Sequence, residues 1–388
     1  MKKLALVLLF PVFAAHASGW STADRSAGAM GVAGAATART DEPGYNAAAA
    51  MMRPGLSLLG GTLLARPSLS ASGDGISAST DGGVSTPPHV FARWANDTIG
   101  AGVSLTVPFG SQIEWPADWA RRFDLVEARI SVLRVGAQVG WHNERFAISA
   151  GPFIDVGSLA LVKAIDFVEA EGRASIDTKA VGAGAMISAF AHVTQQIDLG
   201  LTYTSRSSLS LKGWADFTTP PELRGRALDQ EVSASVTTPD RIALGGVWRL
   251  APGWDVSLDL EMYLWSTIDE LVIDFAEPSM SDTRQPRDWG VTVTPRVGAT
   301  WSALEWLSVR GGFYLDPSPV PSSTLGPSSP DSLRIGAALG AGLAFSENVG
   351  LDVGSQLVVF TGNKSASGVD FGGVALLAGA SLRIAFPE

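Results

Sequence analysis

The chain has 388 residues and a formal net charge of −10, and an acidic chain is a poor candidate for nucleic-acid binding, because neutralising phosphate supplies most of that affinity. It has no cysteine, which excludes disulfides, thiolate metal sites and cysteine nucleophiles, and its four histidines offer little for metal binding or catalysis. With a charged fraction of only 17%, the chain is too apolar to be disordered. Its 43 glycines and 22 prolines favour many short elements over long helices.

Residues 1–17 predict a secretory signal peptide. Lys2 and Lys3 give a positive start, residues 4–15 form an apolar run, and small residues flank position 16 as at a cleavage site. The run is too short to span a bilayer, which takes about 20 residues. We therefore expect an exported protein whose mature chain begins at Ser18.

Residues 18–52 are rich in glycine, alanine, serine and threonine and show almost no alternation. The glycine string at residues 28–34 superficially suggests a phosphate-binding loop, but no strand precedes it and its spacing fits neither nucleotide fingerprint. The segment is therefore either a free tail or a stretch whose small residues allow close packing inside other structure.

From about residue 55 onward, apolar residues alternate with polar or small ones. In residues 254–264 the even positions are apolar, whereas the odd positions include Asp255, Asp259 and Glu261. This period predicts strands with one apolar face. The runs hold register for roughly 11 to 13 residues, whereas soluble strands usually have about 5–6 residues and membrane-crossing strands need about 9–11. The pattern favours an all-β transmembrane barrel over a soluble β protein.

Short and long connections alternate along this part of the chain, which predicts 14 antiparallel strands with both ends of the barrel on the short-turn side. The short connections lie near residues 95–98, 142–145, 194–196, 250–253, 302–305 and 346–348. Longer ones lie near residues 72–85, 109–127, 163–178, 215–230, 276–288, 316–330 and 362–368. Tryptophans beside the short turns predict an aromatic girdle at the periplasmic rim; they are Trp94, Trp141, Trp248, Trp254, Trp301 and Trp306.

Three stretches carry a family resemblance: residues 26–38 followed by Asn46, residues 201–213, and residues 316–334 followed by a glycine-rich strand. Together they resemble the long-chain fatty-acid transporter family of outer-membrane proteins, the FadL type, which also includes channels for monoaromatic hydrocarbons. The resemblance implies a Gram-negative outer-membrane barrel at residues 53–388, with residues 18–52 folded inside it as a hatch. Asn46 would pin the hatch to the wall, although it is equally suited to a turn.

The resemblance also implies a route for the cargo. Members of the family bind hydrophobic substrate at the outer loops, pass it to an interior pocket and release it sideways at an inward kink in the third strand. Here that strand would be about residues 99–109, with Gly100, Gly102 and Pro108 available to weaken pairing. We expect passive uptake of hydrophobic compounds, and long-chain fatty acids are the favoured cargo. A monoaromatic hydrocarbon channel and an aqueous porin for small polar solutes are the alternatives.

Two features depart from the family pattern. Ala47 stands where the family hatch usually carries proline, so a fixed backbone angle is lost. The chain ends on Glu388 instead of an aromatic residue. Recognition by the barrel assembly machinery would then depend on Leu382, Ile384 and Phe386.

Candidate substrate contacts follow from the inward face of the alternation. Arg206 and Lys212, on the strand rising toward the fourth outer loop, could hold a carboxylate head group. The alternative is that lumen charges pair with each other or with the hatch. Apolar residues expected to line an interior pocket, or else to pack on the hatch, are Phe153, Tyr263, Trp265, Tyr314 and Leu377. Exposed apolar residues expected in the outer loops, for ligand capture or lipopolysaccharide contact, are Trp115, Trp119, Phe123, Phe167, Trp214 and Phe217.

We expect no enzymatic activity, no cofactor and no metal. His89, His142 and His192 are the only mature histidines, and the sequence shows no nucleophile–histidine–acid arrangement. The expected partners are the hydrophobic substrate, outer-membrane lipid and lipopolysaccharide, and the barrel assembly machinery. A barrel filled by its own hatch needs no second subunit, so we expect a monomer.

Overall fold

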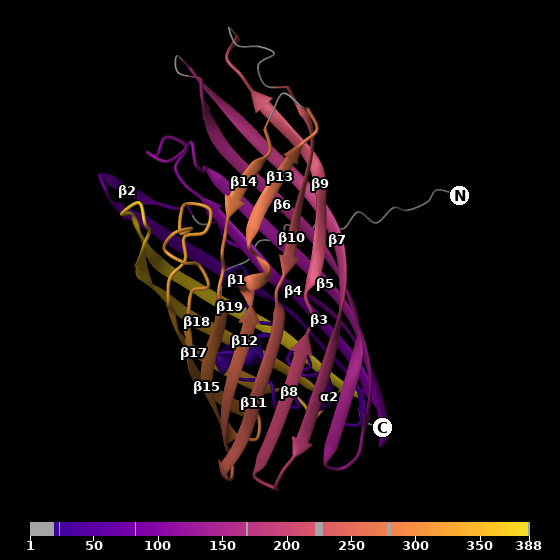
Figure 1. Cartoon of the computed structure of the whole chain (residues 1–388). Coiled ribbons are helices and arrows are strands. Elements are labelled where there is room, and N and C mark those ends of the chain that lie inside the picture. Colours follow the sequence, from indigo (N-terminus) through magenta and orange to yellow (C-terminus); the bar gives the residue numbers. More distant parts are fainter. Residues whose placement is uncertain are drawn as a thin grey trace.

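The computed structural model describes residues 19–22, 24–81, 83–167, 170–221, 228–277 and 281–386. The predicted signal peptide lies outside these residues. The strand segments form one antiparallel sheet that closes on itself, because β1 (Gly55–Gly73) pairs along its length with β19 (Asp370–Phe386). The result is a barrel of tilted strands (Figure 1).

The other strand segments are β2 (Ile76–Ser79), β3 (Pro88–Ala95), β4 (Ile99–Glu114), β5 (Glu127–His142), β6 (Phe146–Asp166), β7 (Glu171–His192), β8 (Ile197–Thr204), β9 (Ser207–Thr218), β10 (Gln230–Thr238), β11 (Asp240–Ala251), β12 (Trp254–Leu264), β13 (Glu270–Phe275), β14 (Thr283–Pro286), β15 (Val291–Leu304), β16 (Leu307–Asp316), β17 (Arg334–Ala344) and β18 (Val349–Lys364). Five barrel strands consist of two segments each: β2 with β3, β8 with β9, β10 with β11, β12 with β13, and β14 with β15. The barrel therefore has the 14 strands that the sequence predicted.

The alternation divides side chains between the outer surface and the lumen. In β12, Leu258 and Leu260 are 60% and 51% exposed, whereas Asp259 and Glu261 are 5% and 4% exposed. Apolar residues thus face outward and polar residues face inward, as in a barrel whose solvent is lipid. No helix among the described residues is long and apolar enough to cross a membrane.

All six predicted short connections are present and lie at one end of the barrel (Figure 1). The six tryptophans predicted beside them have exposed fractions of 40% to 54%. Trp254 and Trp301 stack with ring centroids 5.5 Å apart. Exposed indoles beside the short turns match the expected girdle, because amphipathic rings prefer the membrane–water interface.

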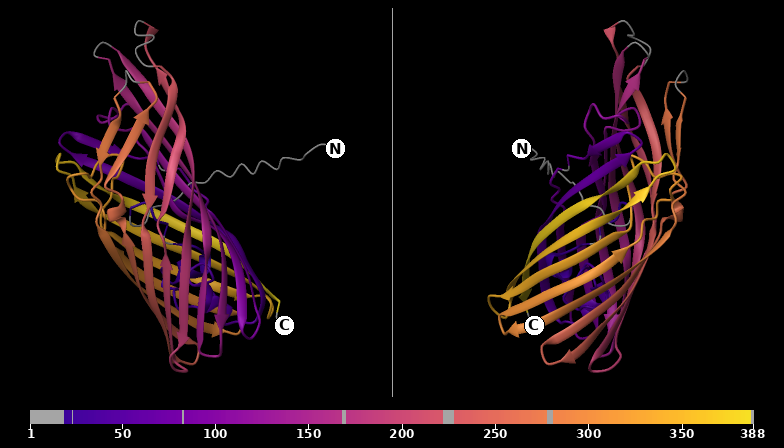
Figure 2. Two further views of the ribbon diagram at one scale, coloured as in Figure 1. Left: turned by 45° about the vertical axis from the view of Figure 1, so that its right-hand side comes forward. Right: turned by 90° about the vertical axis from the view of Figure 1, so that its left-hand side faces the viewer.

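The opposite end of the barrel is uneven. The longest strands, β6 with 21 residues and β7 with 22, run well past the others, and β9 follows them on one side of the mouth (Figure 2). Long strand extensions in place of loose loops create a wall above the barrel. A cavity lies between these extensions.

The described residues 19–22 and 24–54, named here the N-terminal segment, lie inside the barrel toward the short-turn end (Figure 2). It contains two short helices, α1 (Ala27–Gly31) and α2 (Ala47–Met51). Helix α1 packs against β17 and β18, and α2 packs against β5, β6 and β7. The segment therefore contacts opposite parts of the inner wall.

Candidate transport pathway

A cavity of about 230 Å³ lies at the long-loop end, between the extensions of β6, β7, β9, β13 and β14. We name it the outer cavity. Its apolar lining consists of Leu125, Leu161, Val162, Ile165, Ala174, Ile176, Phe217, Ile273 and Phe275, and its polar lining of Asp124, Lys163, Ser281, Thr283, Gln285 and Ser328. An apolar concave surface with a few polar groups suits a hydrophobic ligand with one polar end.

An aromatic cluster lies further inside and brings together Trp20, Phe109, Tyr263, Trp265 and Trp289. The ring of Trp289 is 4.9 Å from that of Trp20 and 5.3 Å from that of Trp265, measured between centroids. Trp265 also stacks on Tyr263 at 5.7 Å and meets Phe109 edge-on at 6.0 Å. Contacts of this kind contribute beyond apolar burial alone. The cluster joins the N-terminal segment to β4, β12 and the connection that precedes β15.

A crevice of about 10 Å³ beside Trp20 and Trp289 shares Ser328 with the outer cavity. The crevice therefore borders the outer cavity at Ser328 and the aromatic cluster at Trp20 and Trp289. The crevice itself is too small for a cargo molecule.

Strand β4 loses its β3 partner partway along its length. Pairing of β4 with β3 ends where Leu105 lies opposite Val90. Residues 106–111 are all buried instead of alternating, and the pairing with β5 shifts register between Thr106 and Phe109. On the edge of β4 that faced β3, pairing with the β2–β3 strand resumes among the described residues where the Asp81 amide donates to the Glu114 carbonyl at 3.0 Å. The strand thus bends inward at Val107 and Pro108, which leaves one edge without a β3 partner.

Residues 20–22 of the N-terminal segment occupy this edge. The Thr22 amide donates to the Pro108 carbonyl at 2.8 Å, and the Gly110 amide donates to the Trp20 carbonyl at 2.7 Å. Ser21 and Phe109 form the bridge between these bonds. The segment therefore completes the sheet where β3 leaves it incomplete, because an unpaired edge in lipid would leave backbone groups without partners.

A second cavity of about 60 Å³, the inner cavity, lies on the other side of the kink. The N-terminal segment contributes Arg25, Pro43, Gly44, Ala47, Ala50 and Met51, and the wall of β3, β4 and β5 contributes Phe91, Ala92, Arg93, Gly102, Val103, Ser104, Thr106, Pro108, Arg134, Gly136 and Gln138. Val103 is 57% exposed on the outer surface. The inner cavity thus reaches the wall at the β3–β4 junction.

Glycines on the inner wall let the N-terminal segment approach closely. We name this set the glycine belt: Gly200, Gly245, Gly298, Gly312, Gly340 and Gly354, from β8, β11, β15, β16, β17 and β18. A Cβ added at Gly312 would lie 2.6 Å from the Val32 carbonyl carbon, and one at Gly200 would lie 2.1 Å from the Thr37 carbonyl oxygen. Any side chain on the belt would push the segment away.

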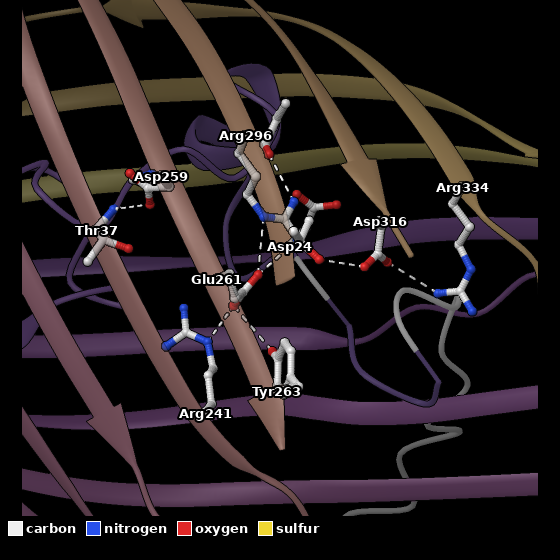
Figure 3. Close-up of polar contacts among 12 residues, drawn as sticks. Asp24, Thr37, Arg241, Asp259, Glu261, Tyr263, Arg296, Asp316 and Arg334 are labelled. Atoms are coloured by element: carbon white, nitrogen blue, oxygen red, sulfur yellow. Dashed lines mark hydrogen bonds and ion pairs between the residues drawn. The ribbon is translucent and has the colours of Figure 1, made fainter. Parts of the chain in front are cut away.

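Hydrogen bonds fix the segment to the same wall. The Asp259 carboxylate accepts from the amides of Ala36 at 3.0 Å and Thr37 at 2.8 Å (Figure 3). The Asn46 side chain accepts from the Ala49 amide and donates to the carbonyls of Thr37 and Ala189. Asn46 therefore caps α2 and also reaches β7.

Below the aromatic cluster, buried charges pair with each other. Glu261 lies between two guanidiniums: Arg241 donates to one oxygen, and Arg296 Nη2 lies 2.9 Å from the other (Figure 3). Arg296 also donates to the Ala33 carbonyl at 3.0 Å. These partners satisfy charges that would otherwise be costly to bury. As the sequence alternative stated, lumen charges pair with one another and with the N-terminal segment.

Two carboxyls of the N-terminal segment lie in surroundings that favour their protonated form. Burial, together with the nearby carboxylates of Asp41 and Asp352, raises the pKa of Glu42 from 4.5 to about 8. Burial raises the pKa of Asp24 to about 6, against the attraction of Arg296. Docking of the segment is therefore coupled to proton uptake.

The structure contradicts the prediction that Arg206 and Lys212 line the lumen. Arg206 is 56% exposed and pairs with Asp240 at 2.7 Å, and Lys212 is exposed on the outer face of β9. The strand is interrupted between β8 and β9, at residues 205–206. In β8 the even-numbered residues face inward, whereas in β9 the odd-numbered residues, such as Leu209, face inward. A one-residue shift reverses every side chain that follows.

The aromatic residues predicted in the outer loops divide into four groups. Trp115 and Trp119 are only 1% and 5% exposed and stack at 4.5 Å, so they are part of the core beneath the loops and do not form an exposed capture surface. Trp214 is exposed on the outer face of β9, which the same register break explains. Phe217 lines the outer cavity. The side chains of Phe123 and Phe167 are half-buried, and neither belongs to the lining of the outer cavity.

The two glycines predicted to weaken pairing do not do so. Gly100 pairs with Ala95 of β3 and with Gly140 of β5. Gly102 is likewise paired on both sides. The loss of pairing begins beyond Leu105, at the bulge that contains Pro108.

Of the predicted pocket residues, Tyr263 and Trp265 belong to the aromatic cluster. Phe153 and Tyr314 are buried against guanidiniums, 3.6 Å from Arg134 and 4.8 Å from Arg296, and Leu377 packs on the core nearby. Sequence reasoning missed Trp20, Phe109 and Trp289. Only the isolated Trp20 in a segment of small residues gave a signal that could have been followed.

Comparison with known proteins places the chain among transporters. Residues 10–377 match the outer membrane protein transport family OMPP1/FadL/TodX. An outer membrane protein of Neisseria meningitidis is 22% identical over 86% of this chain and 85% of its own length. The long-chain fatty acid transport protein of Escherichia coli is 28% identical, and that match spans about half of each chain, 48% of this one and 46% of the other.

Solved structures show the same fold. A FadL homologue of Pseudomonas aeruginosa superposes with a TM-score of 0.82 at 17% identity, over 95% of this chain and 99% of that one. The toluene transporter TbuX of Ralstonia pickettii superposes with a TM-score of 0.74 at 16% identity, over 93% and 98%. The family match covers nearly the whole chain, and the described residues form the family's barrel. The chain belongs to the FadL/TodX family and is an outer-membrane transporter of hydrophobic compounds from a Gram-negative bacterium.

Proposed function

We propose that this protein is a passive channel for long-chain fatty acids. In this proposal the cargo enters the outer cavity, moves past the aromatic cluster when residues 20–22 leave the edge of β4, and is released sideways between β3 and β4. The observation that carries the proposal is the position of two cavities near residues 20–22 and the kink of β4: the outer cavity shares Ser328 with the crevice beside Trp20, and the inner cavity is lined by Thr106 and Pro108 of β4.

The contacts of the N-terminal segment support sideways release over passage to the periplasm, although a cavity of about 430 Å³ at the short-turn end shares Pro43 and Arg93 with the inner cavity. The N-terminal segment lies against the glycine belt at van der Waals distance, and the ion pairs of Glu261 lie beside it. Moving the segment out of the lumen would disrupt these contacts. Opening the edge of β4 involves fewer residues: it breaks the backbone hydrogen bonds of residues 20–22, the bond from Thr22 Oγ1 to the Val107 carbonyl, and the packing of Trp20 on Trp265 and Trp289.

The lining of the outer cavity supports a hydrocarbon cargo. Each buried CH₂ group contributes about 0.8 kcal/mol, so a long acyl chain can bind by apolar contact alone. Lys163 is the one cation in the lining and is exposed, which suits a first contact with an anionic head group. The likeness to the Escherichia coli fatty acid transport protein favours fatty acids, whereas the toluene transporters share the fold at lower identity.

Two other functions stay as alternatives. A monoaromatic hydrocarbon would also fit the aromatic cluster, and toluene transporters have this fold. An aqueous porin would need an open polar lumen, whereas the N-terminal segment and the aromatic cluster fill this one. We propose no enzymatic activity. A monomer assembled by the barrel machinery and surrounded by lipid and lipopolysaccharide fits the proposal.

The first test is uptake of labelled oleate and labelled toluene by cells that lack their own transporter of this kind, with and without surface-confirmed protein. Oleate uptake supports the proposal. Uptake of toluene alone selects the aromatic channel. A large steady conductance in planar bilayers with no uptake of either compound selects the porin.

A disulfide lock tests the lateral route. Ser21 and Phe109 form a non-hydrogen-bonded antiparallel pair, for which Cα atoms are about 4.5 Å apart and a disulfide can form. Because the chain has no cysteine, the double variant Ser21→Cys with Phe109→Cys can form only this bridge. Oxidation should stop oleate uptake and reduction should restore it, while the Ser21→Cys single variant stays insensitive. Equal uptake by oxidised and reduced double variant would eliminate this exit.

A further inference from the structure

Two lysines lie directly opposite each other on the outer surface of the barrel. Lys179 of β7 is in register with Lys212 of β9, and both side chains are exposed. The chain beyond the predicted signal peptide has only four lysines, so this one pair uses half of them. Side chains that face each other across antiparallel strands have Cβ atoms about 5 Å apart, and like charges in such a pair destabilise the sheet. An anion between the two ammonium groups would remove this repulsion.

The protein does not supply that anion from the residues that the structure describes. No described carboxylate lies within 4.0 Å of the ammonium group of Lys179 or Lys212. Two acidic residues of the same outer face, Asp177 of β7 and Glu231 of β10, are one row nearer the long-loop end, and both are in register with Trp214 instead. The two lysines therefore remain open to an anion from outside the chain.

The lysine pair marks the outer boundary of the apolar band. The outward-facing residues of β7 between positions 181 and 191 are all apolar, and Lys179 is the first charged residue beyond them. This stretch of 11 residues has the length that a strand needs to cross a membrane, about 9–11 residues. The neighbouring strand β6 is likewise apolar on its outer face from position 146 to position 156. The ammonium groups therefore lie where the acyl chains of the outer leaflet end and the head groups begin.

Serine hydroxyls flank the two lysines in the same row. Ser158 of β6 is in register with Lys179, and Ser233 of β10 is in register with Lys212. Both serines are half-buried. The row thus presents two cations between two hydroxyl groups that can donate hydrogen bonds. A phosphate group accepts from both kinds of donor, and its bonds with charged donors are the stronger ones.

We infer that Lys179 and Lys212 bind a phosphate group of the outer-leaflet glycolipid, the lipid A part of lipopolysaccharide, on the outside of the barrel. Val156 and Val181 form the next row toward the membrane and are 48% and 68% exposed, so acyl chains of the same lipid can lie against them. Trp214 on the other side of the row is 45% exposed, as suits an interfacial indole. The extensions of β6, β7 and β9 rise above this row (Figure 2), so the bound lipid would brace the base of that wall.

The test measures the thermal unfolding midpoint of the purified full-length protein in a non-ionic detergent, with and without lipid A that carries both phosphates. Lipid A should raise the midpoint of the wild type, because a ligand that binds only the folded state stabilises it. The double variant Lys179→Gln with Lys212→Gln should lose most of this shift and bind fluorescent lipid A roughly 10- to 30-fold more weakly. EDTA in all samples removes divalent cations, through which Asp177 and Glu231 could otherwise hold the phosphate.

A charge reversal separates lipid binding from a merely structural role. Lys212→Glu replaces repulsion with attraction to Lys179, so it should not lower the midpoint in detergent alone, yet it should abolish the response to lipid A. The matched control is Lys364→Gln, because Lys364 of β18 is exposed and lies opposite Asp370 of β19. This control should keep the wild-type response to lipid A.

The other outcomes would overturn the inference. Equal lipid A shifts in the wild type and the double variant, or no shift in the wild type, would show that the lysines hold no lipid. Lipid A without its phosphates should give a smaller shift, and an equal one would show that apolar contact alone acts. Inorganic phosphate alone should give no comparable shift, and an equal one would show an anion site that is not a lipid site. If electrophoretic heat modifiability shows that the double variant has not folded, Lys212→Glu decides. None of these measurements involves cargo, so the proposed function can fail without affecting the inference.

Discussion

Gly312 offers a direct test of how the N-terminal segment closes the barrel. In the substitution Gly312→Ala, the new Cβ would lie 2.6 Å from the Val32 carbonyl carbon, 2.8 Å from the Ala33 Cβ and 2.9 Å from the Ala33 amide nitrogen. Two of these three atoms belong to the backbone and cannot rotate away. Overpacking of this kind costs about 1–3 kcal/mol.

That cost acts only on the docked state of the segment. At about 1.4 kcal/mol per tenfold change, the undocked population should rise roughly 5- to 150-fold. Gly311 is the matched control, since a Cβ there would meet nothing closer than 3.8 Å. Gly311→Ala should change the population by no more than about twofold, as surface substitutions do.

Trypsin provides the assay. Arg39 lies within the segment, is 9% exposed and pairs with Asp41 at 3.0 Å, so cleavage after it requires undocking. When opening and closing are fast, the cleavage rate follows the open population. The rate of cleavage after Arg39 in folded Gly312→Ala should therefore exceed the rates in wild type and Gly311→Ala roughly 5- to 150-fold. Mass spectrometry of the product identifies the cleavage site. Equal rates in all three proteins would show that the glycine belt does not hold the segment.

Three further predictions concern the charges and the core. Glu261→Gln leaves Arg241 and Arg296 without their carboxylate and should lower the free energy of unfolding in urea by about 3–5 kcal/mol. The control Glu270→Gln, in the exposed pair with Arg284, should lower it by less than about 1 kcal/mol. Similar losses in the two variants would contradict the argument from burial. Because the pKa of Glu42 is raised to about 8 in the docked segment, its contribution to docking is complete below its ordinary value of 4.5 and is lost as the pH rises through 8. Planar-bilayer currents should thus show more open events at pH 8 than at pH 5, and Glu42→Gln should remove most of this dependence; an unchanged pH response would exclude Glu42 as its source. Trp119→Ala, which breaks a buried stacked pair, should cost about 3–5 kcal/mol in urea unfolding, whereas Trp214→Ala on the exposed face should cost less than about 1 kcal/mol.

The barrel could be predicted from local signals because a two-residue period and turn lengths are properties of the sequence itself. Leu258 and Asp259 face opposite sides because successive residues in a strand must do so. The positions of the short turns and of Trp254 and Trp301 beside them followed in the same way. These features need no knowledge of what lies across the lumen.

The same reasoning failed where the period is interrupted. The break at residues 205–206 exchanges the two faces, so Lys212 points outward although an unbroken count places it inward. Of the three residues expected to weaken pairing in the third strand, only Pro108 lies in the bulge, whereas Gly100 and Gly102 are paired on both sides. Local propensity does not reveal a one-residue shift, because the register of a strand depends on which neighbouring strand supplies its hydrogen bonds.

The sequence by itself determined the class of this protein, its strand number, the side that faces lipid and the end that carries the short turns, since all of these follow from periodicity along one chain. Only the tertiary structure decided which residues meet inside. Trp20 joins Trp265 and Trp289 across more than 240 positions of sequence, and the Asp259 carboxylate accepts from the amides of Ala36 and Thr37. Such contacts arise from barrel closure and from the path of the N-terminal segment, which bring together groups that no local pattern relates.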